Sequence, residues 1–256
     1  MPEIDLTGAN LCFADLRGAN LSQAKLEKAD LSGANLFGAN LYQADLKGAS
    51  LLSAKLFGAN LVEVDLRRTD LLGTSFQGTT LQRAHLDGAN LSSLQLGGAD
   101  LRQATLTQAQ MVGTDLTSAH LEGADLSAAE MQGANLREAR LIRAHLSRAH
   151  LNGAFLQSAT LVWAEAEEID LTHADLSDAD LFEANLSGAC LVHSKLDRAD
   201  LSRARLVWAD LSWSSLSSAR LLYTDLSRAI LGNADLRGAD MRGSDLTGAN
   251  LHAARR

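Results

Sequence analysis

The chain has 256 residues, of which 46% are hydrophobic but only 4% are aromatic, and it contains a single proline. Its formal net charge of −8 disfavours a nucleic-acid partner, because binding to phosphates requires clustered lysine and arginine. No apolar run of about 18 residues and no signal-like leader occur, so we expect a cytoplasmic protein without a membrane span.

A five-residue repeat begins at the first residues of the chain and continues to the last. From Leu6 to Leu251 every fifth residue is leucine at 45 of 50 positions, which we call the central positions. The residue two before the central position is alanine in 38 of 50 repeats. The frame never slips, so the sequence predicts one continuous repeat domain over residues 1–256 without internal loops.

A period of five residues is incompatible with a simple helix or a flat strand. Leucines five apart spiral around an α-helix, and on a strand they alternate between the two faces. A short extended piece followed by a bend puts each leucine and its alanine inside. Of the 20 glycines in the chain, 18 lie two residues after a central position and mark the bend. This preference for glycine indicates positive φ, as in a type II turn. Aspartate or asparagine precedes 27 of the 50 central residues. We expect these short polar side chains to bond nearby backbone amides at the same corner.

The run Ala9-Asn10-Leu11, Ala14-Asp15-Leu16-Arg17-Gly18 resembles the A(D/N)LXX signature of pentapeptide-repeat proteins. The resemblance covers residues 4–254 and implies an all-β fold, a right-handed quadrilateral parallel β-helix with 20 residues per coil and about 12–13 coils. One coil cannot offset the conformational entropy of ordering its backbone, so stacking between coils must stabilise the fold.

Residues 20 apart occupy the same place in successive coils and form columns. Ile142, Val162 and Phe182 form three apolar rungs of one column, and Phe37 lies above Phe57 in another. An exposed apolar column is typical of a protein interface, although bulky side chains can also simply cover neighbouring rungs. The other aromatic residues predicted to point outward near a possible interface are Trp163, Trp208, Trp213 and Tyr223.

Acidic residues concentrate in about one coil and are flanked by arginine-rich coils. We expect these acidic residues to form ion pairs with basic residues of adjacent coils. The alternative is that they form a charged band that steers a partner protein. The band consists of Glu165, Glu167, Glu168, Asp170, Asp175, Asp178, Asp180 and Glu183. His173 and His193 should stack beside Asp170 and Cys190, but this cluster does not lead us to predict a metal site. The two cysteines fit no zinc or redox spacing, and we predict no cofactor.

No motif or converging set of side chains points to catalysis, so we predict a non-enzymatic scaffold that binds an unidentified protein partner. Similarity to the family offers a second interpretation, a DNA mimic that binds DNA gyrase or topoisomerase IV and protects it from quinolones or toxins. A third is an idealised or designed repeat without a biological partner. Met1-Pro2-Glu3 and the residues after Leu251 contain no capping helix, which allows end-to-end self-association.

Overall fold

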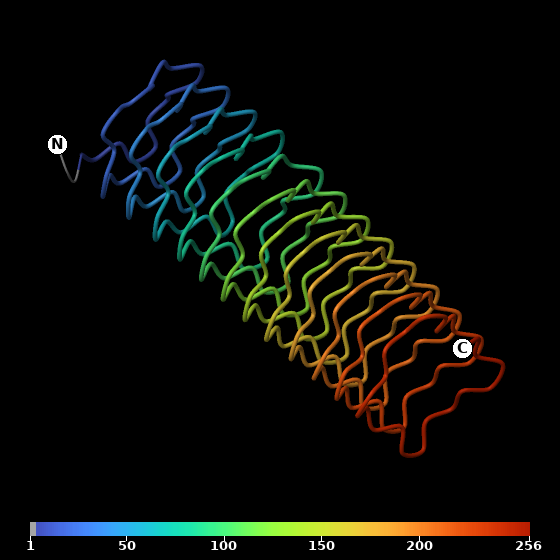
Figure 1. Cartoon of the computed structure of the whole chain (residues 1–256). Coiled ribbons are helices and arrows are strands. Elements are labelled where there is room, and N and C mark those ends of the chain that lie inside the picture. The colour runs from blue at the N-terminus through green and yellow to red at the C-terminus, as the bar shows by residue number, and fades with distance from the viewer. Residues whose placement is uncertain (1–3) are drawn as a thin grey trace.

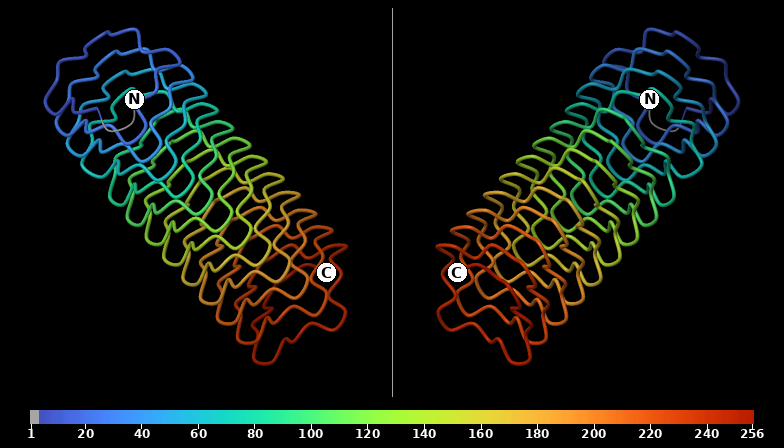
Figure 2. Two further views of the ribbon diagram at one scale, coloured as in Figure 1. Left: turned by 90° about the vertical axis from the view of Figure 1, so that its left-hand side faces the viewer. Right: turned by 90° about the vertical axis from the view of Figure 1, so that its right-hand side faces the viewer.

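The computed structural model describes residues 4–256, so Met1, Pro2 and Glu3 lie outside the described residues. The chain forms an elongated rod of stacked coils with its ends far apart (Figures 1 and 2). From Asp5 to Asp235 all but one of the residues that precede a central position make an isolated parallel bridge to the residue 20 positions later, as Asp125 does to His145. Within residues 4–256 there is no helix, and hence none that could cross a bilayer. Four pentapeptides complete each coil, which confirms the predicted quadrilateral β-helix.

Every backbone N–H of a typical repeat has a partner, as one pentapeptide illustrates. The N–H groups of Asp170, Leu171 and His173 donate to carbonyl oxygens of the adjacent coils at 3.0, 2.7 and 3.0 Å. Ala174 donates to the carbonyl of Leu171 at 2.9 Å and closes the turn. The remaining N–H, that of Thr172, donates to Oδ1 of Asp170 at 2.9 Å. The aspartate therefore accepts from the one donor that the coils leave free.

The same side-chain bond recurs at every repeat that has aspartate or asparagine before its central residue. All 27 of these residues accept a hydrogen bond from the backbone N–H two positions later. The prediction that these side chains bond nearby amides is confirmed. Aspartate and asparagine are abundant here because they accept a hydrogen bond from a backbone N–H that has no other partner. Many of the acidic residues therefore stabilise the fold and need no binding site to explain them.

The bend has the same backbone conformation in all fifty repeats. The second residue after each central position has φ between +53° and +73°, whether it is one of the 18 glycines or one of the 32 other residues. The first residue after the central position is never in this region. Positive φ at only the second turn residue defines a type II turn. The prediction from the glycine pattern is confirmed and extends to turns that contain no glycine.

We name the parts of the rod after their first members. The four faces are the Leu6, Leu11, Leu16 and Leu21 faces, after their first central residues. The four corners are the columns formed by the second turn residues, and they are the Gly8, Phe13, Gly18 and Gln23 corners.

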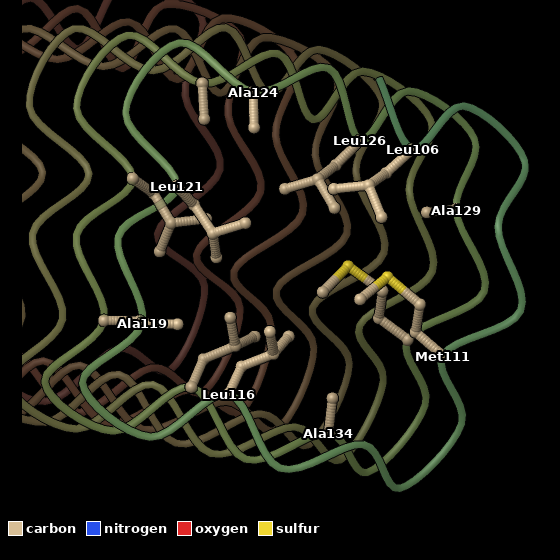
Figure 3. Packing of buried hydrophobic residues seen from close by; sticks show 14 of the residues in the cluster. Leu106, Met111, Leu116, Ala119, Leu121, Ala124, Leu126, Ala129 and Ala134 are labelled. Carbon is tan, nitrogen blue, oxygen red and sulfur yellow. The ribbon is translucent and has the colours of Figure 1, made fainter. Parts of the chain in front are cut away.

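Side chains fill the interior of the rod. Leu106, Met111, Leu116 and Leu121 point toward the axis from the four faces of one coil (Figure 3). Away from the end coils the alanines two residues before the central positions are buried with them, as Ala119 is. Met111 and Met131 are both buried, and Figure 3 shows the sulfur of Met111 beside a second sulfur. Flexible thioethers suit such a place in an otherwise uniform leucine core.

One coil departs from this regularity. In residues 61–80 all four alanines are replaced, by Val64, Thr69, Thr74 and Thr79, and one central leucine is replaced by Phe76. The buried threonine hydroxyls each donate to a leucine carbonyl of the preceding coil, for example Thr79 at 2.9 Å. Among positions 5 to 235 only Asp70 lacks its bridge, and a cavity of about 80 Å³ opens beside it. We attribute the missing bridge to the larger side chains, which occupy space that alanine leaves free.

Candidate functional site

The Gln23 corner carries a nearly continuous chain of side-chain contacts along the rod. In its first half Gln23 donates to Gln43 at 3.0 Å, and Gln43 donates to Glu63 at 2.7 Å. Further on, Trp163 Nε1 donates to Glu183 at 2.8 Å, and Glu183 pairs with Arg203 at 3.3 Å. Corner side chains therefore interact with the next rung instead of extending freely into solvent.

The predicted Ile142–Phe182 column is less open than the sequence analysis expected. Ile142, Val162 and Phe182 are all half-buried, because each rung shields the next. The guanidinium of Arg203 also lies 5.9 Å from the centroid of the Phe182 ring. These side chains therefore cover the neighbouring rungs of the column. A role of the column as an interface stays a prediction.

Trp163, on the adjoining corner, is held from both sides. Arg143 lies 4.8 Å from its ring centroid, and Glu183 accepts its indole N–H. About 42% of the residue stays exposed. Much of its bonding capacity is already used within the rod, so Trp163 is a weaker candidate for a contact residue than its position in the sequence indicated.

Phe37 and Phe57 form the most open apolar site on the Leu16 face. Their rings stack with centroids 5.6 Å apart and an angle of 12°, and about half of each residue is exposed. They border a groove of about 660 Å³ that is also lined by Arg17, Asn35, Lys55, Ser75 and Gln77. The stacking of the two rings agrees with the predicted column.

Glycine keeps the approach to this groove clear. The Gly18 corner adjoins the phenylalanines and carries glycine in its first five rungs, at Gly18, Gly38, Gly58, Gly78 and Gly98. A corner without side chains lets another surface come close to the rings. This run, together with the basic residues Arg17 and Lys55 of the groove, was not included in the sequence prediction. Reading the corner columns next to the aromatic column would have revealed it.

Three exposed aromatic residues of the C-terminal half lie on three different corners. Trp208, Trp213 and Tyr223 are all exposed, but they belong to the Gly8, Phe13 and Gln23 corners respectively. The structure does not bring them together into one site. Tyr223 lies over Gly243, where an added Cβ would come within 2.5 Å of its ring.

The predicted histidine stack is present and extends to a third ring. His173 and His193 have centroids 4.9 Å apart and planes within 2° of parallel, and His193 also stacks on Trp213 at 6.1 Å. No three histidine, cysteine or carboxylate groups within residues 4–256 are arranged to hold a metal ion. The Cys190 thiol lies 3.1 Å from the hydroxyl of Thr172.

The acidic band encircles one coil, and half of its carboxylates are paired with basic residues of the adjacent coils. Four of its carboxylates form ion pairs with residues 20 positions away: Arg148–Glu168 at 2.8 Å, Lys195–Asp175 at 3.7 Å, Arg198–Asp178 at 2.6 Å and Arg203–Glu183 at 3.3 Å. Asp170, Asp175 and Asp180 also accept the turn N–H described above. The predicted pairing across coils is therefore present, and its role in steering a partner stays untested.

Comparison with known proteins agrees with this geometry. The family model for pentapeptide repeats matches ten overlapping segments that together run over residues 4–255. No curated protein matches the chain in a sequence search. The crystal structure of HetL, a pentapeptide repeat protein involved in heterocyst differentiation regulation from Nostoc sp. strain PCC 7120, is 35% identical. That similarity covers 85% of this chain and 89% of HetL, with a TM-score of 0.67.

Two further solved structures are more distant. A pentapeptide repeat protein from the thylakoid lumen of Arabidopsis thaliana is 26% identical over 44% of this chain and 66% of its own, with a TM-score of 0.27. QnrB1, a plasmid-mediated fluoroquinolone resistance protein, is 19% identical over 96% of this chain and 92% of its own, with a TM-score of 0.25. The matched repeats and the similarity to HetL place this chain in the pentapeptide-repeat protein family.

Proposed function

We propose that this protein is a non-enzymatic rod that binds a protein partner through the groove beside Phe37 and Phe57. Two adjacent, half-exposed phenylalanine rings are the observation that carries the proposal, because apolar groups held in water favour association with another surface. The glycine corner gives a partner access to them. The groove is open and shallow, as a docking surface for a protein is.

The charges beside the rings favour a partner segment with acidic residues. Arg17 already pairs with Asp15 at 2.6 Å, whereas Lys55 has no ion pair among the described residues. Lys55 thus provides a positive charge at the groove of a protein whose net charge is negative. A segment that combines apolar and acidic side chains complements both features.

The filled interior and the Cys12 thiol support a binding role over a catalytic one. The core is filled by leucine and alanine, so residues 4–256 form no enclosed, water-excluding site of the kind that catalysis requires. A hydrogen bond to Asp30 raises the pKa of the Cys12 thiol and keeps it in its less reactive protonated form. HetL, which takes part in regulating heterocyst differentiation, is consistent with a regulatory role for a rod of this family.

DNA mimicry remains the alternative function, and no observation favours it over protein binding. A duplex mimic needs rows of uncompensated carboxylates, whereas half of the acidic band is paired with basic residues. A gyrase supercoiling assay with and without a quinolone tests it. Protection at stoichiometric protein would support mimicry, and no effect at a large excess would exclude gyrase.

Affinity capture with matched variants tests the proposed function. The double substitution Phe37→Ser and Phe57→Ser removes both rings from an exposed surface. Leu52→Ser with Leu72→Ser is the control, since these residues are also exposed, apolar and 20 positions apart, on the Leu11 face. We expect a protein that is retained by the wild type and by the control but lost with the phenylalanine variant. Equal retention by all three proteins would contradict the proposal.

A further inference from the structure

One corner of the rod contains a ladder of interacting side chains that lacks a rung. On the Gly8 corner Arg148 donates to Glu168 at 2.8 Å. Trp208 lies 40 residues after Glu168 in the same column, and Arg228 lies 4.8 Å from its ring centroid. Between Glu168 and Trp208 the column holds Gly188, which has no side chain. The positions on either side of the gap are a carboxylate and an exposed indole.

The gap is a hollow of about 330 Å³, which we call the Gly188 hollow. It is lined by Glu167, Glu168, Ser187, Gly188, Val207 and Trp208. About 60% of Trp208 is exposed. Glu168 uses Oε2 for Arg148, and Glu167 uses Oε1 to accept from Asn185 at 2.7 Å. The other oxygen of each carboxylate has no hydrogen-bond donor among residues 4–256 and is available to a ligand.

The unbroken ladder from Arg143 to Arg203 on the Gln23 corner shows which group fits between such neighbours. On the Gln23 corner Arg143 stacks on Trp163 at 4.8 Å, and Arg203 pairs with Glu183 at 3.3 Å. The rod thus places guanidinium groups against both indole and carboxylate partners. A guanidinium is planar enough to stack on an aromatic ring and carries several donors for carboxylate oxygens.

We propose that the Gly188 hollow binds an arginine side chain of a partner protein. The incoming guanidinium would take the place of the missing rung, stack on Trp208 and donate to the free oxygens of Glu167 and Glu168. Charge complementarity selects this occupant, because the lining contains two carboxylates and no basic residue. The hollow uses different residues from the Phe37–Phe57 groove, so either site can fail in an experiment while the other holds.

Nuclear magnetic resonance of the three indole N–H groups tests the proposal with a defined probe. Acetyl-arginine amide is titrated into the full chain, with acetyl-citrulline amide as the uncharged probe of nearly the same shape. We expect a saturable shift of the Trp208 indole signal with a midpoint in the millimolar range, and little change with citrulline. Trp163 and Trp213 serve as internal references. Equal shifts with both probes, or equal shifts of all three indoles, would overturn the proposal.

Two substitutions separate occupancy of the hollow from general charge effects. Gly188→Gln fills the gap in a turn conformation that Gln108 already adopts on the same corner, and an added Cβ meets its nearest atom at 3.5 Å. We expect it to raise the midpoint at least about tenfold. Gly153→Gln is the control, because it makes the same change at φ +69° on another corner with no atom near its Cβ. Unchanged binding by Gly188→Gln would refute the assignment.

Discussion

The second turn residue is where this backbone carries its strain. In 32 of the fifty turns it is not glycine, yet it adopts a left-handed conformation that costs an L-residue roughly 1–2 kcal/mol. The turns are held by the hydrogen bonds between coils on both sides of them. The repeat can therefore accept almost any side chain at its corners, and the corners are where the surface of the rod varies.

Replacing two neighbouring alanines by glycine tests this account of strain, because the two changes should alter stability in opposite directions. Ala128 lies at a corner with φ +54°, whereas Ala129 is a fully buried core residue. We expect Ala128→Gly to stabilise the protein by about 0.5–1 kcal/mol, because glycine adopts positive φ without steric cost. Ala129→Gly should destabilise it by about 1 kcal/mol or more. Guanidinium chloride unfolding measures both, and a shift in the same direction for the two variants would contradict the account.

Two substitutions of an aspartate that precedes a central residue separate the effect of its turn hydrogen bond from the effect of its charge. Asp210 accepts the N–H of Ser212 at 2.9 Å through Oδ1, a bond that asparagine can also make. We expect Asp210→Asn to leave stability nearly unchanged and Asp210→Ala to lower it by about 1 kcal/mol. Thermal unfolding of the two variants is the measurement. If asparagine proved as damaging as alanine, charge and not the turn bond would explain the residue.

At the scale of the coil, one pair of replacements tests how the core is filled. Ala166 stands at a central position and Ile169 at an alanine position, and both are fully buried. The turn bond from Ile169 N–H to the carbonyl of Ala166 is 3.4 Å long, compared with 2.9–3.1 Å in most turns. We expect Ile169→Ala to cost about 2–5 kcal/mol, because it leaves a cavity that Ala166 cannot fill.

The reciprocal change completes this test. Ala166→Leu alone should destabilise the coil by overpacking, and Ala166→Leu with Ile169→Ala should restore most of the lost stability by returning the consensus pattern. Thermal unfolding of the two single variants and the double variant gives the coupling. Additive effects would show that the two residues do not compensate each other.

The sequence predicted those features that depend on register. Because residues 20 apart lie in one column, the stacking of Phe37 on Phe57, the histidine stack and the ion pairs of the acidic band all followed from counting. The exposure of a side chain could not be predicted by counting. The shielding of Ile142, Val162 and Phe182 depends on the size of the side chains in neighbouring rungs. The missing bridge at Asp70 also needed coordinates, because it results from crowding by several replaced alanines.

At the scale of the whole molecule, the many aspartates that accept hydrogen bonds determine how the stability of the rod depends on pH. The hydrogen bond from Arg237 lowers the pKa of Asp235 to about 2, and other aspartates such as Asp15, Asp178 and Asp245 have pKa values lowered by neighbouring donors. A lowered folded-state pKa means that the stabilisation is complete above the unfolded value of about 3.9. It is lost as the pH falls through the folded value.

We therefore expect a melting temperature that is nearly constant from about pH 5 to 7 and falls steeply between about pH 4 and 2. Asp235→Asn should remove part of this dependence, since asparagine has no proton to gain. Circular dichroism melts across this pH range provide the measurement. A melting temperature that rose on acidification would contradict the assignment of these carboxylates as stabilising when ionised.

The measurement that most directly tests the central claim is photo-crosslinking in the cells that make the protein. A photoreactive phenylalanine analogue replaces Phe57 in one variant, and Leu72 and Phe182 in two others, so that three faces of the rod are compared. We predict one discrete crosslinked protein from position 57 and none of that size from positions 72 and 182. The same product from all three positions, or a product from position 182 alone, would contradict binding through the Phe37–Phe57 groove.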